Sequence, residues 1–179
     1  DPGGHIRRAM TRFPIPGIAA AVRQRYFRPE GLPSGTPYKL LPMYRQTVSR
    51  AREQLTMLAN FVEVYLAREG HDGPVGINLL TKIQLPTLAS LYGAMLAGVD
   101  CVLMGAGIPR EIPAVLDTLA EHRPAAVRFE VEGVPPGTTE YLRLDPGEHW
   151  SETPAPLRRP LFLPIIASNS LGTVLARKA

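Results

Sequence analysis

Apolar residues recur every three or four positions between residues 49 and 69, and this spacing predicts one amphipathic helix. The apolar positions on its predicted inner face are Leu55, Leu58, Ala59, Val62, Tyr65 and Leu66. Gly70 follows this stretch, and a glycine just past a helix can adopt the left-handed conformation that ends it. The pattern therefore predicts a single helix with one buried face and a defined end.

After residue 73, short apolar runs alternate with further helical patterns. Strands are predicted at residues 74–80, 99–104, 126–131, 141–144 and 161–167, and helices at residues 86–97, 110–122 and 170–178. Apolar strands separated by amphipathic helices are typical of parallel strands joined by right-handed crossovers. The fold class predicted is therefore α/β, as either a doubly wound sheet or a (β/α)₈ barrel.

Residues 1–47 form a segment of different character, rich in proline and arginine. A short helix is predicted at residues 18–27, and the prolines of residues 31–42 predict a loop. Basic residues greatly outnumber acidic residues before residue 53. The arginines are scattered among prolines and apolar residues, without the aromatic motifs or helix-turn-helix pattern of nucleic-acid-binding proteins. We interpret residues 1–47 as a solvated N-terminal extension of a domain at residues 48–179, with no nucleic-acid partner.

Composition narrows the class of protein. The chain has 179 residues, of which 45% are hydrophobic and 20% charged, with a formal net charge of +4. This length and composition suit one globular domain or slightly more. Cys101 is the single cysteine, so the chain has no internal disulfide. No apolar run is long enough to span a bilayer, and no apolar segment of a signal peptide follows the N-terminal charges. We therefore expect a cytoplasmic protein without a membrane partner.

Candidate chemistry is sought at the carboxyl ends of the predicted parallel strands, because both α/β architectures bind ligands there. The polar residue of the first strand is Asn78, and Thr81 and Lys82 lie just beyond it. A buried amide needs a hydrogen-bond partner, which for Asn78 is either the backbone or a ligand. The last predicted strand is followed by Ser168. The four histidines have no metal-ligand spacing with one another or with Cys101, so no metal site is predicted.

The segment Gly105-Ala106-Gly107 lies between a predicted strand and a predicted helix. Glycines at such a turn allow a ligand to approach the backbone, and the helix N-terminus favours an anion. A dinucleotide-binding fingerprint would require a third glycine at position 110, where Arg110 stands. Glu130 or Glu132 lies roughly where a ribose-binding acid would be. A Rossmann-like nucleotide-binding domain is therefore one alternative.

Several segments carry a family resemblance. They are Gly73-Pro74-Val75-Gly76-Ile77-Asn78-Leu79-Leu80, Lys82-Ile83-Gln84-Leu85-Pro86-Thr87, Leu91-Tyr92-Gly93-Ala94-Met95-Leu96-Ala97-Gly98-Val99-Asp100 and Val102-Leu103-Met104-Gly105-Ala106-Gly107-Ile108-Pro109-Arg110-Glu111-Ile112-Pro113. Together they resemble the nitronate monooxygenase family, also called 2-nitropropane dioxygenase-like, in a bacterial branch with a long N-terminal extension. The resemblance covers most of the chain from about residue 12 and is strongest between residues 59 and 116.

The resemblance implies an FMN-dependent (β/α)₈ barrel that oxidises a small nitronate or nitroalkane. Asn78, Gly105, Gly107 and Ser168 would then line the flavin side of the barrel mouth. The catalytic histidine of the family falls on Gly105, so no catalytic base is assigned here. A nitronate is already an anion and can be oxidised without one. A reductase related to trans-acting enoyl reductases is a further implied possibility.

The length of the chain bears on this implied barrel. A (β/α)₈ barrel takes about 250 residues, and residues 48–179 amount to about half of that. The glycine-rich phosphate-binding segments found on later strands of the family have no counterpart here. We therefore expect residues 48–179 to be the N-terminal part of a barrel, truncated at its C-terminus. A non-catalytic module that keeps only the fold is the third possibility.

Overall fold

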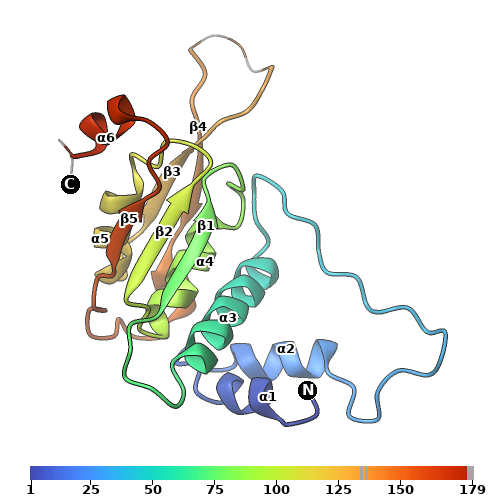
Figure 1. The fold of residues 1–179 in the computed structure, drawn as a ribbon. Helices are drawn as coiled ribbons and strands as arrows, with labels where there is room; N and C mark the ends of the chain where they lie inside the picture. Colours follow the sequence, from blue (N-terminus) through green and yellow to red (C-terminus); the bar gives the residue numbers. More distant parts are fainter. Residues whose placement is uncertain (134, 136, 177–179) are drawn as a thin grey trace.

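The computed structural model describes residues 1–133, 135 and 137–176 (Figure 1). The helices are α1 (His5–Met10), α2 (Ile18–Tyr26), α3 (Arg50–Ala67), α4 (Thr87–Leu96), α5 (Ile112–Ala120) and α6 (Asn169–Ala176), with a 3₁₀ turn η1 (Pro146–His149). The strands are β1 (Gly76–Leu80), β2 (Cys101–Gly105), β3 (Ala125–Phe129), β4 (Glu140–Leu144) and β5 (Leu161–Pro164). The predicted helices α2 to α6 and all five predicted strands are present, whereas α1 was not predicted.

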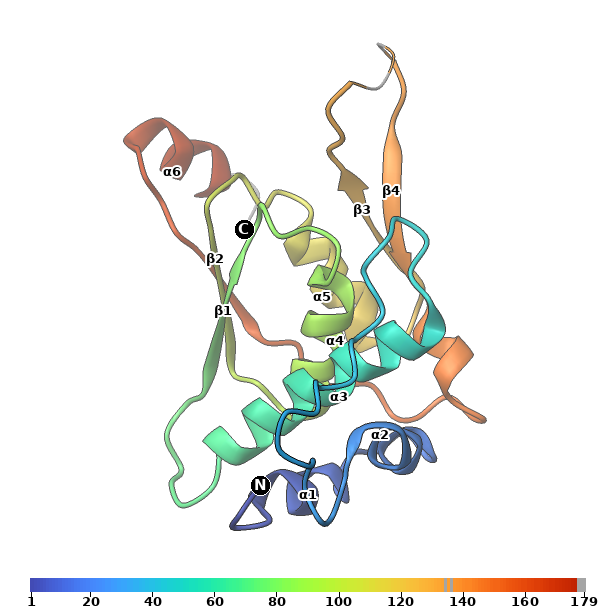
Figure 2. The same ribbon diagram turned by 90° about the vertical axis from the view of Figure 1, so that its right-hand side faces the viewer.

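The centre of the fold is a parallel sheet in the order β1-β2-β5. Asn78 of β1 lies opposite Leu103 of β2, which lies opposite Leu163 of β5. The alternate residues of β2, Val102 and Met104, are buried. Seen along its edge, the sheet has α4 and α5 on one side, and the β3–β4 hairpin lies beyond these helices (Figure 2). The main core therefore lies between the sheet and the helices.

The expected partial (β/α)₈ barrel is wrong. β3 pairs with β4 as an antiparallel hairpin in a separate sheet, and the described strands do not close into a barrel. In β3, Val127 is buried whereas Arg128 is exposed. This alternation suits a strand that is buried on one face, while barrel strands are covered on both faces and are apolar throughout. A hairpin also closes a short loop, which costs little chain entropy.

The first part of the N-terminal extension is packed rather than solvated. Phe13, Ile15 and Ile18 are buried and belong to the same core cluster as α3. The Phe13 ring meets the Phe61 ring of α3 edge to face, with centroids 5.1 Å apart. Residues 28–41 then run as a long exposed segment, and the residues that follow it up to α3 are in part half-buried (Figure 1). Only this later segment matches the solvated extension that the sequence predicts.

Asp100 joins four parts of the chain at the amino end of the sheet. Its Oδ2 accepts a hydrogen bond from the Val75 N–H at 2.8 Å and forms an ion pair with Arg68 Nη1 at 2.6 Å. Its Oδ1 is paired with Arg158, which lies shortly before β5. The backbone hydrogen bond from Val75 and the two arginines lower the pKa of Asp100 from 3.8 to about 2.

We expect Asp100 to make folding sensitive to acid. Because its pKa is lower in the folded chain, its contribution to stability is complete above the unfolded pKa and is lost as the pH falls through the folded pKa. Between about pH 5 and pH 2, Asp100→Asn should therefore lose less unfolding free energy than the original chain. Urea unfolding across this range measures the difference. The control is Asp117→Asn, which removes an ion pair from a more exposed carboxylate. If the unfolding free energies of Asp100→Asn and the original chain fell in parallel with pH, the expectation would be contradicted.

Candidate functional site

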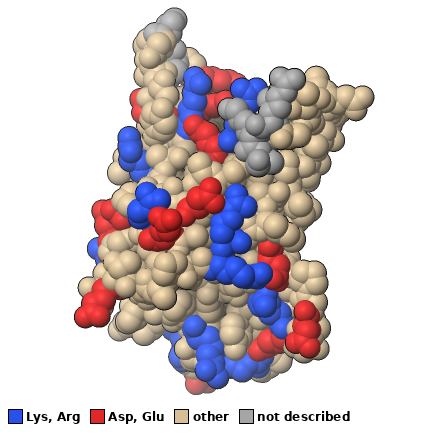
Figure 3. Space-filling view, turned by 90° about the vertical axis from the view of Figure 1, so that its left-hand side faces the viewer, with Lys and Arg blue, Asp and Glu red and all other residues tan. Residues whose placement is uncertain are grey.

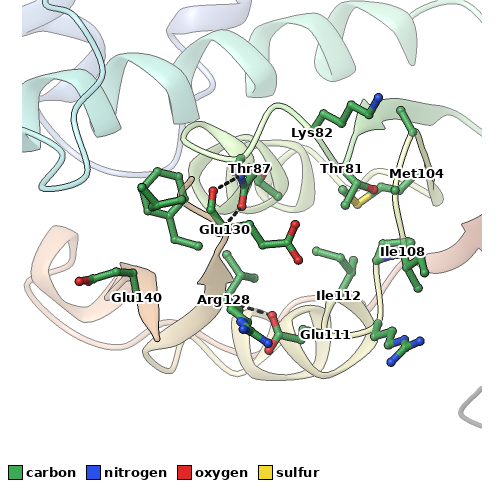
Figure 4. A pocket seen from close by; sticks show the side chains of 18 of the residues that line it. Thr81, Lys82, Thr87, Met104, Ile108, Glu111, Ile112, Arg128, Glu130 and Glu140 are labelled. Carbon is green, nitrogen blue, oxygen red and sulfur yellow. Dashed lines mark hydrogen bonds between the residues drawn. The ribbon is translucent and has the colours of Figure 1, made fainter. Parts of the chain in front are cut away.

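The carboxyl ends of β1, β2 and β3 surround a cavity of about 920 Å³. Its walls are the β1–α4 loop, the β2–α5 loop and the end of β3 (Figure 4). Side chains of both charges line it: Lys82, Arg110, Arg128, Glu111, Glu130, Glu132 and Glu140. This is the place where ligands bind in α/β sheets, so the cavity is the first candidate site.

The β2–α5 loop is built around Gly107. Its φ is +155°, and a Cβ at this position would lie 2.8 Å from the Cβ of Thr81. Ala106 before it also has a positive φ of 57°. The Thr81 N–H donates to the Gly105 carbonyl at 2.8 Å, which joins the two loops. The buried Oγ1 of Thr81 has no hydrogen-bond partner among the described residues, so this wall of the cavity contains an unpaired polar atom.

Side-chain hydrogen bonds attach the end of β3 to both loops. Gln84 Oε1 accepts from the Glu130 N–H at 2.9 Å, and Gln84 Nε2 donates to the Glu130 carbonyl at 3.1 Å (Figure 4). Glu111 Oε2 accepts from the Arg128 N–H at 2.8 Å. These contacts satisfy backbone groups in β3 and just after it, on the side where β3 pairs with no described strand. Sequence patterns did not reveal Gln84, because its role depends on the position of β3.

The structure separates the predicted site residues into two groups. Gly107, Glu130 and Glu132 line the cavity. Asn78 instead lies on the opposite face of the sheet and is exposed. Burial therefore does not force a partner on its amide, and that part of the sequence argument is wrong. Ser168 lies exposed between β5 and α6, with its Oγ 3.1 Å from the Oγ of Ser170.

The face that carries Asn78 is open, and we call it the open face of the sheet. Leu80, Leu161, Leu163 and Ile165 on or beside it are exposed to between 46% and 67%. No helix of the described residues covers its middle (Figure 1), although parallel sheets are usually covered on both faces. Gly105 lies on this face beneath Ile165, since a Cβ there would lie 3.1 Å from the Ile165 side chain. The open face is the second candidate site.

Other kinds of site find little support in the described part of the chain. No group of three His, Cys, Asp or Glu side chains within it could hold a metal ion. Cys101 is half-buried on the open face. Basic and acidic side chains are interspersed on the side of the molecule seen in Figure 3. Of the helices described, none is both long and apolar enough to cross a membrane.

Comparisons with known proteins were made at the level of families, curated sequences and solved structures. No family model, curated protein or solved structure matches the chain. The function is therefore inferred from the two candidate sites and from the sequence segments described above.

Proposed function

We propose that this chain carries the flavin-binding part of an FMN-dependent oxidoreductase that oxidises nitronates. The observation that supports the proposal is the open face, where one amide side chain, Asn78, stands on an otherwise apolar surface. The segments between residues 59 and 116 that resemble nitronate monooxygenases support the same function. We place the protein in the cytoplasm, because a single cysteine suits a reducing compartment.

The residues of the open face fit the chemistry of a flavin. The flavin ring system is flat, with apolar faces and a polar edge of nitrogen and oxygen atoms. Leu103 and Leu163, on the neighbouring strands at the level of Asn78, offer a surface on which such a ring can pack. The Asn78 amide offers one donor group and one acceptor for the polar edge, and it makes no side-chain hydrogen bond with a described residue. We therefore expect Asn78 to orient the ring.

The other predicted residues, Gly105, Gly107 and Ser168, lie further from the middle of the open face. Ile165 covers Gly105, so we do not expect Gly105 to contact the ring directly. Ser168 follows β5 at the carboxyl end of the sheet, where the phosphate group of a nucleotide is usually bound. Gly107 follows β2 at the same end but lines the cavity on the other face, so we do not expect it to contact a ring on the open face. An apolar platform with one amide, next to a strand end that could receive a phosphate, is the feature that supports FMN as the ligand.

When bound, the flavin supplies an acceptor for the electrons of the substrate. A nitronate already carries the negative charge that a nitroalkane acquires by losing a proton. Its oxidation therefore requires no base, which agrees with Gly105 standing where the family has histidine. The proposed roles of the chain are to bind and orient the reactants.

Asn78→Ala tests the proposal. A net hydrogen bond contributes about 0.5–1.5 kcal/mol, so we expect the dissociation constant for FMN to rise by roughly two- to tenfold. Flavin fluorescence during titration of the full chain measures it. Gln24→Ala, which removes an exposed amide from α2, should leave FMN binding unchanged. Equal FMN affinity in Asn78→Ala and the original chain would count against the role of Asn78.

The mixed charges of the cavity favour a second candidate function, the binding of a nucleotide such as NAD. Gly107 with Glu130 and Glu132 offers a turn for phosphates and acids for ribose hydroxyls. NAD is therefore titrated beside FMN. Preferential binding of NAD, weakened by Glu132→Ala, would reverse the order of the two proposals. Binding of neither, without oxygen uptake that depends on an added nitronate, would favour a non-catalytic module.

A further inference from the structure

A second concave region, the α2–α3 groove, lies beside the cavity described above. It has a volume of about 900 Å³, within the range of small-molecule sites. Its walls come from α2, from the segment before α3, from one face of α3, and from the β1–α4 loop.

Most of the lining is apolar or aromatic, and part of it is accessible. Ile83 is 56% exposed and Leu41 is 47% exposed. Ala59 presents an exposed small side chain on the groove face of α3. A ligand that covers these groups would remove apolar surface from water, which is favourable in proportion to its area. The groove therefore favours a ligand with an apolar body.

The polar residues of the groove are held in place by the protein. The Tyr44 hydroxyl is hydrogen-bonded to Thr56 Oγ1, and the Arg52 guanidinium lies 4.5 Å from the centre of the Tyr44 ring. Asn60 Nδ2 donates to Ser90 Oγ at 3.2 Å and to the Thr56 carbonyl at 3.0 Å. These contacts make a defined wall and floor.

The charges of the groove have one sign. Arg52 and Lys82 line it, and no Asp or Glu is among its described lining residues. The buried Nε of Arg52 has no hydrogen-bond partner in the described part of the chain. The neighbouring cavity, by contrast, carries acids as well as bases. An anionic group is therefore complementary to the α2–α3 groove, whereas the acids of the neighbouring cavity would repel it.

We infer that the α2–α3 groove binds an amphipathic anion, a molecule with an unbranched apolar body and one carboxylate or sulfonate group. The apolar body lies along α3 against Leu55, Ala59 and Ile83. The anionic group pairs with Lys82 or Arg52, the two cationic residues that line the groove. This inference does not depend on the flavin proposal, because the ligand binds without flavin and at a different face.

Titration calorimetry of the full chain with octanoate tests the inference, with hexanoate and 1-octanol for comparison. Each buried methylene contributes about 0.8 kcal/mol, so octanoate should bind roughly tenfold tighter than hexanoate. 1-Octanol should bind more weakly than octanoate because it has no charge. Lys82→Met should weaken octanoate binding about two- to fivefold, the range expected for an exposed ion pair, and leave 1-octanol binding unchanged.

Ala59→Asp is the decisive variant, because it places a carboxylate at an exposed position within the groove. We expect it to weaken octanoate binding at least tenfold, while Ala51→Asp, exposed on the same helix outside the groove, should bind as the original chain does. Circular dichroism checks that both variants fold. Undiminished binding to Ala59→Asp, or equal affinity for octanoate and 1-octanol, would overturn the inference. So would a dimer that Ala59→Asp dissociates without any octanoate binding, because the groove would then be a contact between copies.

Discussion

Replacing Gly93 by alanine is expected to destabilise the fold by about 3 kcal/mol or more, the upper range for adding atoms to a packed core. Gly93 lies in α4 against the backbone of α3, and a Cβ there would lie 2.2 Å from the Met57 carbonyl oxygen and 2.7 Å from its Cα. Backbone atoms of a helix cannot move aside as a flexible side chain can. The two helices would have to separate, which would also disturb buried Leu91 and Met95.

Urea unfolding followed by circular dichroism measures the effect of Gly93→Ala. Gly172→Ala in α6 is a matched control, because a Cβ there would meet its nearest neighbour, Ile166, at an ordinary 3.5 Å. Alanine is a better helix former than glycine by about 1 kcal/mol, so this control should be neutral or slightly stabilising. A Gly93→Ala chain as stable as the original would show that α3 and α4 pack less closely than the structure indicates.

The regular elements could be predicted because each carries its own periodic pattern. The three- and four-residue spacing of α3 and the apolar run of β2 depend on neighbours along the chain. Strand partners depend on distant residues, and β3 was assigned to the wrong sheet for that reason. One local signal was available, namely Arg128 between Val127 and Phe129, because a charge within a strand suits a sheet with one solvated face.

The candidate site could be predicted only in part. The rule that ligands bind at the carboxyl ends of parallel strands predicts a site at Gly107, Glu130 and Glu132, and the structure places these three residues at one cavity. The same rule assumed that the polar residue of β1 is buried, whereas Asn78 faces the open side of the sheet. The face on which a strand residue lies follows from alternation, but which face is covered depends on the whole fold. The α2–α3 groove had no sequence signal, since its walls come from segments that are far apart in the sequence.

A chain of buried and partly buried hydrogen bonds connects α4 to the segment before β5. Trp150 Nε1 donates to the Tyr92 hydroxyl at 2.7 Å, and the Tyr92 hydroxyl lies 2.7 Å from His122 Nδ1. His122 Nε2 lies 2.9 Å from the Ala155 carbonyl, which can only accept. Nε2 therefore carries the proton, and Nδ1 accepts from Tyr92. Each hydrogen bond of the chain then joins one donor to one acceptor.

Tyr92→Phe is expected to destabilise the fold by about 2–4 kcal/mol, since it removes the shared hydroxyl while keeping the ring. The Trp150 N–H and His122 Nδ1 would both lose a partner, and each unpaired buried group costs about 1–3 kcal/mol. Urea unfolding measures the loss, and Tyr141→Phe, on a 44% exposed side chain, should change stability little. Burial raises the pKa of Tyr92 to about 12. In a pH titration its phenolate absorbance should therefore appear at a higher pH than that of exposed tyrosines, and this step should be absent in Tyr92→Phe. If Tyr92→Phe were as stable as the original chain, the hydroxyl would not join the three side chains.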